Sequence, residues 1–112
     1  MNNNIHTVMH ILCRLGITAN YAGFHYTAYA VMLAVEDPSR LQLVTKWLYP
    51  EVAARYGTNA DNVRKCIAKV RDIAWDNDPE LLSEMAMHKL KKKPGTSEFP
   101  AILAVYLLLT PY

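Results

Sequence analysis

Apolar residues recur at helical spacing along almost the whole chain. Between residues 60 and 75, for example, Val63, Ile67, Val70 and Ala74 stand at positions i, i+4, i+7 and i+11, which places them on one face of a helix. No stretch shows the strict alternation, bounded by hairpin turns, that is typical of strands. The pattern therefore predicts an all-α fold, a compact bundle of about six helices.

Glycine, proline and capping residues predict where these helices begin and end. Gly16 is expected to cap the C-terminus of the first helix, and Thr96–Glu98 to cap the start of the last. Pro50 disfavours α geometry in the residue before it, so a new helix is expected to start there. The nearly all-apolar residues 23–35 suit a central helix, and the run Ala101–Leu109 a buried one. The expected helices cover residues 4–15, 23–35, 40–48, 50–56, 60–75 and 76–88, and the last one contains the apolar run that ends at residue 109.

Residues 50–75 have the pattern of a helix-turn-helix: a short helix, a turn containing glycine and a longer helix. Ala53 is small enough for the two helices to cross, and Gly57 tolerates the left-handed backbone of the turn. Thr58–Asn59 offer capping oxygens for the second helix. The exposed face of that helix, at about residues 60–75, is then free to enter a DNA major groove.

The charge is concentrated on this segment, although the whole chain carries only +2. Residues 40–75 contain seven basic and three acidic side chains, a net charge of +4, whereas the remainder carries −2. Positive charge on one segment is the electrostatic signature expected of a surface that meets phosphates. A charged, solvated helix face in a bundle that never touches DNA is the alternative interpretation of the same pattern.

Length and composition exclude several classes of protein. The chain has 112 residues, of which 52% are hydrophobic and 20% charged, so we expect residues 1–112 to form one folded domain. The longest apolar run, residues 101–109, is about half of the roughly 20 residues that a membrane span requires. Cys13 and Cys66 form neither a disulfide framework nor a zinc motif, and the N-terminus lacks a secretion signal. These features predict a cytoplasmic protein without a membrane partner.

Catalytic and metal sites are not expected either. No Ser–His–Asp or Cys–His arrangement and no glycine-rich phosphate loop is recognisable, so we predict no enzyme and no cofactor. His6, His10 and Cys13 share one helix face at a spacing that would suit a soft metal. No fourth ligand is near, so a partly buried core face is the preferred interpretation, and no metal is predicted.

Two further groups of residues leave alternatives open. Tyr21, Phe24, Tyr26 and Tyr29 could stack on single-stranded nucleic acid, but on an apolar helix a core role is favoured. The basic run Lys89–Lys93 is either a solvated loop or a contact to backbone phosphates.

Several motifs at fixed separations point to a known family. The most specific are Leu48-Tyr49-Pro50, Ala74-Trp75 and Lys93–Phe99, where this chain reads Lys-Pro-Gly-Thr-Ser-Glu-Phe. Together with the residues listed below, they make Leu15–Trp75 resemble, without a gap, the C-terminal DNA-binding domain of the sporulation stage zero response regulator. The resemblance implies a six-helix domain that binds promoter DNA, often as tandem head-to-tail copies. The other matching residues are Leu15, Gly16, Ala19, Gly23, Phe24, Tyr26, Thr45, Lys46, Ala53, Tyr56, Thr58, Ala60, Val63 and Ile67.

Two departures from the family change what is expected. The family regulator has an N-terminal receiver domain; if this chain is complete, we expect no switching by aspartyl phosphorylation. The family's recognition helix reads Ser-Arg-Val-Glu-Arg-Ala-Ile-Arg where this chain has Asp61–Ala68. Asp61 replaces a serine, and would either repel the DNA backbone or cap the helix. The apolar residues that pack this helix on the bundle are kept, whereas the polar residues expected to contact bases are changed.

The altered readers predict a different DNA element. Asn62 stands where the family has an arginine and favours adenine over guanine, and Arg64 replaces a glutamate with a donor suited to guanine. Lys65 keeps the charge of the family's arginine without its bidentate fork. We therefore expect Asn62, Arg64 and Lys65 to contact bases, and Thr58, Lys69 and Lys46 to contact phosphates.

Further partners are suggested by the resemblance. In the family, the region after the recognition helix is implicated in contacting RNA polymerase sigma factor, but the acidic residues here match it poorly, so this contact and a homodimer on DNA stay open. The alternative function is a non-enzymatic interaction module that pairs with a full-length regulator through Ile102–Leu109. The acidic residues concerned are Asp76, Asp78, Glu80 and Glu84.

Overall fold

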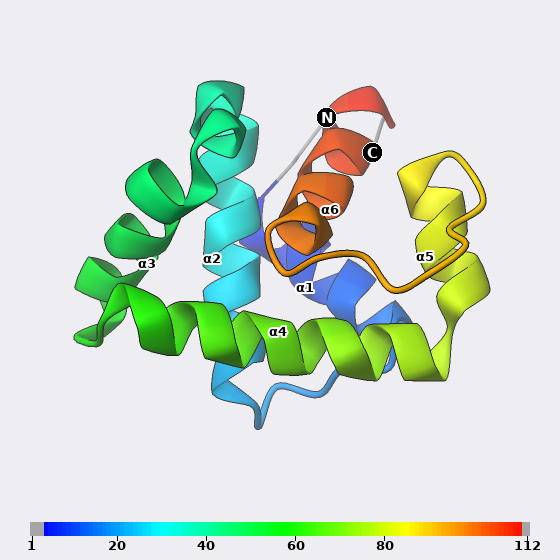
Figure 1. The fold of residues 1–112 in the computed structure, drawn as a ribbon, viewed down its shortest axis with the longest axis horizontal. Coiled ribbons are helices and arrows are strands. Elements are labelled where there is room, and N and C mark those ends of the chain that lie inside the picture. Colours follow the sequence, from blue (N-terminus) through cyan, green and yellow to red (C-terminus); the bar gives the residue numbers. More distant parts are fainter. Residues whose placement is uncertain (1–3, 111–112) are drawn as a thin grey trace.

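The computed structural model describes residues 4–110, and the regular secondary structure in that range consists of helices alone. It has six α-helices without a strand or wing in the described part, which confirms the predicted all-α bundle (Figure 1). The helices are α1 (Ile5–Arg14), α2 (Ala22–Glu36), α3 (Tyr49–Tyr56), α4 (Ala60–Asn77), α5 (Pro79–Ala86) and α6 (Glu98–Leu109).

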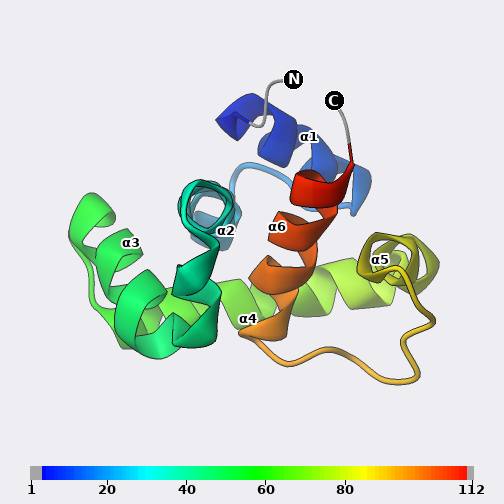
Figure 2. The ribbon, with the colours of Figure 1, turned by 90° about the horizontal axis from the view of Figure 1, so that it is seen from above.

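α2 is the central helix, as expected from its nearly all-apolar sequence. It packs against α1, α4 and α6, and small side chains such as Ala28, Ala30 and Ala34 let these neighbours approach closely. α4 lies across the front of α2 and α6, with α3 near one of its ends and α5 near the other (Figures 1 and 2). One long face of α4 is therefore left uncovered by the other helices.

The ends of several helices confirm the expected capping chemistry. The Thr7 N–H donates to Asn4 Oδ1 at 3.1 Å at the start of α1, and Gly16 follows that helix with a φ of +89°. At the start of α6, Ser97 takes the cap position without a side-chain cap bond. Glu98, the last of the three expected capping residues, does act: the Gly95 N–H donates to its Oε1 at 2.7 Å, so a first-turn carboxylate satisfies a free amide.

The segment before the helix-turn-helix differs from the single helix expected over residues 40–48. It consists of a 3-10 helix, η1 (Pro38–Gln42), and a π-helical turn, η2 (Val44–Leu48). A new helix does start beside Pro50, one residue earlier than expected: α3 begins at Tyr49, whose backbone is helical although proline disfavours that geometry in the residue before it. The Tyr49 N–H bonds to Val44 in the wider π register, and Leu48 takes the distorted dihedral angles.

α6 is less buried than its sequence suggested. Phe99, Leu103 and Leu107 lie in the core, but the outer face leaves Leu109 64% exposed. The expectation of a fully buried helix is wrong because α2 and α5 cover only part of its circumference. Val105 and Leu108, each 42% exposed, share the uncovered side.

The crossing of α2 and α4 leaves no room for a side chain at Gly23. A Cβ there would lie 2.3 Å from the Cys66 carbonyl oxygen and 2.4 Å from Val70 Cγ2. At Gly57, by contrast, a Cβ would meet nothing within 4 Å, and only its φ of +68° resists substitution.

Substitution at these two glycines should therefore have unequal effects. We expect Gly23→Ala to lower the free energy of unfolding by about 2–3 kcal/mol, because the backbone oxygen cannot move aside. Gly57→Ala should cost about 1 kcal/mol, for backbone strain alone. Urea denaturation of both variants measures the difference, and an unchanged midpoint for Gly23→Ala would contradict the close crossing.

Candidate nucleic-acid interface

α3, a three-residue turn and α4 form the predicted helix-turn-helix. Gly57 ends α3 in the left-handed conformation, and the Thr58 N–H donates back to the Ala53 carbonyl at 3.0 Å. Asn59 then caps α4, its Oδ1 accepting the Asn62 N–H at 2.8 Å. The expected turn glycine and capping residue are both confirmed.

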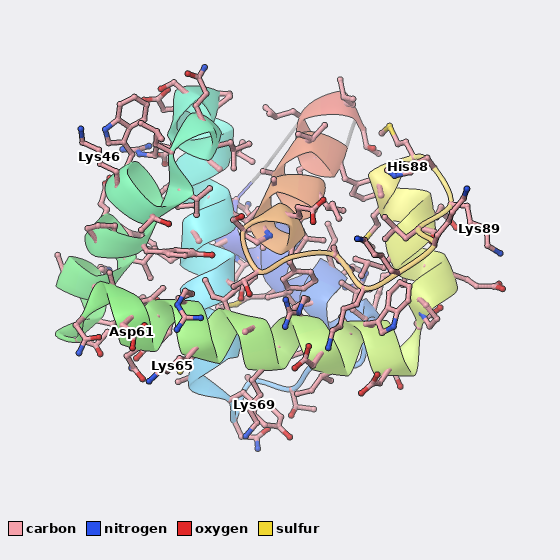
Figure 3. The ribbon with its side chains drawn as sticks, viewed as in Figure 1. Lys46, Asp61, Lys65, Lys69, His88 and Lys89 are labelled. Atoms are coloured by element: carbon pink, nitrogen blue, oxygen red, sulfur yellow. The ribbon has the colours of Figure 1, made fainter. Side chains whose placement is uncertain are left out.

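The inner face of α4 fixes its orientation on the bundle. The predicted stripe of Val63, Ile67, Val70 and Ala74 is completely buried. On the 18-residue helix, this seat leaves the opposite face in solvent, where Arg64, Lys65 and Lys69 are exposed. In Figure 3, Lys65 and Lys69 point away from the body of the molecule.

Asp61 pairs with two of the predicted base readers. Its carboxylate lies 2.9 Å from Arg64 Nη2 and 3.2 Å from Lys65 Nζ. The hydrogen bonds from Arg64 and Lys65 lower the pKa of Asp61 below its ordinary value, so the carboxylate is charged at neutral pH. Of the two roles foreseen for Asp61, helix capping is wrong because Asn59 already occupies that place.

Asn62 is half-buried and already hydrogen-bonded on both sides of its amide. Its Nδ2 donates to Thr58 Oγ1 at 2.9 Å, and the Cys66 thiol approaches Oδ1 at 3.8 Å. Thr58 and Asn62 were predicted to contact phosphate and base separately. The structure joins them in one small network at the start of α4, so neither side chain is freely oriented.

The two remaining predicted phosphate contacts lie far apart. Lys69 extends from α4 over the Tyr21 ring, with its Nζ 5.3 Å from the ring centroid. Lys46 is on η2 and exposed, and Figure 3 places it well away from Lys65 and Lys69. The structure therefore does not unite Lys46 with the cations of α4.

The aromatic residues of α2 divide between two roles. Phe24 is in the core, as favoured, whereas Tyr21, Tyr26 and Tyr29 are half-buried. Tyr26 and Tyr29 pack around Tyr56 of α3, with ring centroids 5.2 and 6.0 Å away. These tyrosines brace the short helix rather than forming an open stacking platform.

Two arginines of the basic segment serve the fold and not the exposed face. Arg71 donates to the Pro94 carbonyl at 3.3 Å and to Thr96 Oγ1 at 3.1 Å, and also pairs with Asp72. Arg40 donates to the Leu33 carbonyl at 2.8 Å and pairs with Glu51 at 3.2 Å. The count of +4 over residues 40–75 thus overstates the charge available to a polyanion. The sequence did not reveal this structural role of Arg71, because its partners Pro94 and Thr96 follow it by more than 20 positions.

The basic loop, residues 89–95, is attached to α4 at one end. Lys93 Nζ lies 2.8 Å from Asp72 Oδ1, while Lys89, Lys91 and Lys92 are exposed. The Lys93 hydrogen bond is the main reason that the pKa of Asp72 is lowered. The loop therefore lies beside α4, and Lys93 is not a free cation.

The N-terminal group of potential metal ligands is exposed. His6, His10 and Cys13 lie on the outer side of α1, because Val8, Ile11 and Leu12 take the core side. The expectation that they would form a partly buried core face is wrong. Over residues 4–110, no three or more His, Cys, Asp or Glu side chains gather in a way that could hold a metal ion.

The fold and this surface define a helix-turn-helix domain whose second helix, α4, has exposed basic side chains. Residues 8–107 match the family described as "Sporulation initiation factor Spo0A C terminal", and the chain belongs to that family. This family consists of DNA-binding domains of a sporulation regulator and is not a family of enzymes. None of the helices within the described range is both long and apolar enough to cross a membrane.

The Asp72 ion pairs should hold the basic loop against α4. We expect Asp72→Asn to increase amide hydrogen exchange at residues 93–96 several-fold and to lower global stability by about 1 kcal/mol or less, because the pairs are partly exposed. Asp76→Asn, on the same helix and without an ion pair among the described residues, is the control.

The pH dependence of the loop follows from the lowered pKa of Asp72. The contribution of the Asp72 ion pairs to holding the loop against α4 should be complete above the ordinary Asp pKa of about 3.9. It should be lost as the pH falls through the lower pKa of the folded state. Hydrogen exchange of the wild type and Asp72→Asn should therefore converge in strong acid. A constant difference between them at all pH values would contradict this account.

Proposed function

We propose that this domain is a sequence-specific transcriptional regulator that places α4 in the major groove of double-stranded promoter DNA. The observation that carries the proposal is the combination, on one helix, of a completely buried apolar stripe and an opposite face exposing Arg64, Lys65 and Lys69. A helix of this length extends for about 27 Å, enough to lie along the groove. Membership of the DNA-binding family supports the same conclusion.

Three residues of α4 are proposed to read bases. Arg64 donates to guanine, and Lys65, beside it on the exposed face, supplies a flexible donor. Asn62 reads adenine with the lone pair and the N–H that its bonds to Thr58 and Cys66 leave available. Its fixed amide would make this contact selective, because the side chain cannot turn freely to suit another base.

Phosphate contacts are assigned to residues around this helix. Thr58, at the turn, and Lys69, farther along α4, would bind the backbone on the two sides of the groove. Lys46 lies outside this face and would reach only a more distant phosphate, so we expect the smallest effect there. The exposed lysines of the basic loop leave its two interpretations open.

Of the four acidic residues considered for a contact with the sigma factor, one caps α5. Asp78 is half-buried and caps α5, its Oδ1 accepting the Leu81 N–H at 3.0 Å, so its carboxylate serves the fold. Asp76, Glu80 and Glu84 are exposed and form the acidic surface that would face the polymerase.

The alternative, an interaction module, is favoured by the uncovered face of α6. Val105, Leu108 and Leu109 are exposed beside a hollow of about 270 Å³ that Met87 and Ile102 help to line. An apolar patch of this kind is typical of a protein contact. Such a contact is also compatible with a homodimer on DNA, so the two functions need separate tests.

The DNA-binding function can be tested with duplexes selected from a random pool. We expect the logarithm of the association constant to fall linearly with the logarithm of salt concentration, with a slope of about −0.9 for each phosphate contact. Arg64→Ala with Lys65→Ala should weaken binding to the selected element by about 2–6 kcal/mol, on the basis of about 1–3 kcal/mol for each base contact. Lys69→Ala should weaken all sequences alike and make the slope shallower by about 1.

Arg14→Ala is the matched control, because Arg14 is exposed in the last turn of α1 and is not among the proposed DNA-contacting residues. It should leave sequence preference unchanged. Equal binding of the wild type to selected and scrambled duplexes at moderate salt would contradict sequence specificity. No binding even at low salt would favour the interaction module.

The interaction module can be tested without DNA. Sedimentation velocity should show self-association that weakens at least tenfold in Leu109→Ser with Leu108→Ser, because the most exposed apolar surface of α6 is removed. Lys92→Ser, on the exposed loop, controls for a general surface effect. A monomer at all concentrations would argue against pairing of two copies through α6.

A further inference from the structure

Asp61 carries a negative charge at the point where the proposed function requires contact with a polyanion. Its side chain is 60% exposed, on the same face of α4 as Arg64 and Lys65. In Figure 3, Asp61 and Lys65 are neighbours on the first turns of α4, and no other element covers them.

The carboxylate takes two of the three exposed cations of α4. Arg64 and Lys65 follow Asp61 by three and four positions, so one helical turn brings both within ion-pair distance, at 2.9 and 3.2 Å. Asp61 is not the N-cap of α4, because the Asn62 N–H is bound by Asn59, although its negative charge in the first turn is favoured by the helix dipole. Its interactions among the described side chains are with these two cations.

We infer that Asp61 is an internal competitor of DNA, which holds Arg64 and Lys65 in the free protein and thereby suppresses binding to non-specific sequences. The inference rests on the proposed function. A phosphate must displace the carboxylate from these cations and also overcome its charge. Non-specific binding is almost entirely electrostatic, so it loses the most from such a competitor.

Binding to the correct element should lose less. Bidentate hydrogen bonds from Arg64 to guanine give an attraction that a phosphate contact alone does not, and the guanidinium can keep its bond to Asp61 while it donates to the base with its other N–H groups. The carboxylate then orients Arg64. Asp61 would consequently raise the ratio of specific to non-specific affinity while lowering both affinities.

The test compares Asp61→Asn with the wild type on the selected element and on a scrambled duplex over a range of salt. Asparagine keeps the size of the side chain and removes its charge. We expect affinity for the scrambled duplex to rise about tenfold, affinity for the element about threefold or less, and the salt slope on the scrambled duplex to steepen by about 1. Asp61→Ser, which restores the residue type of the family, should act in the same direction.

Asp76→Asn is the charge-matched control, since it removes one negative charge from the exposed C-terminal end of the same helix. If Asp76→Asn and Asp61→Asn raise the affinities equally, the effect is general charge and the inference is overturned. If Asp61→Asn instead loses affinity for the element only, Asp61 reads a base directly and the inference is again wrong.

A measurement without DNA separates this inference from the proposed function. Side-chain NMR of the free protein should show slower exchange of the Arg64 Nη2 protons, which bond to Asp61, with water in the wild type than in Asp61→Asn. An unchanged exchange rate overturns the internal competition even where DNA is bound. No DNA binding by either protein at low salt overturns the proposed function, and the inference with it.

Discussion

The close packing of α4 on α2 is the constraint on which the rest of the structure depends. Gly23 admits the backbone of α4 at Cys66, and the buried stripe from Val63 to Ala74 fixes the rotation of the helix about its own axis. A rotation of α4 would bury charged side chains without partners, and the free-energy cost would exceed the small net stability of a domain of this size. The same contact that completes the core therefore decides which residues face outward.

The outward face of α4 is less simply positive than its sequence suggests. Asp61 engages Arg64 and Lys65, Asp72 engages Lys93, and Lys69 lies over Tyr21. These contacts are exposed and individually weak, so they orient side chains more than they stabilise the fold. In the proposed function, such a surface would meet DNA with its cations already positioned and with part of its charge already neutralised.

Membership of the sporulation regulator family and the geometry of the surface agree on the class of partner. The apolar residues of α4 are fixed by their packing against the core, because any substitution there would alter that packing. The exposed residues Asp61, Arg64 and Lys65 are free of that constraint. In the proposed function, they are positions at which a DNA preference can change without loss of the fold.

Periodicity and local chemistry, read from the sequence alone, were enough to determine the helices, the turn at Gly57, the cap at Asn59 and the buried stripe of α4, because each depends on residues a few positions apart. Only the tertiary structure decided that Arg71 holds the loop at Pro94, that α6 keeps one apolar side exposed, and that η1 and η2 replace a regular helix. These features depend on contacts between distant segments. The pairing of Asp61 with Arg64 and Lys65 depends on both levels. The spacing of three and four positions in the sequence allows it, and the packing of α4 on the core leaves all three side chains together in solvent.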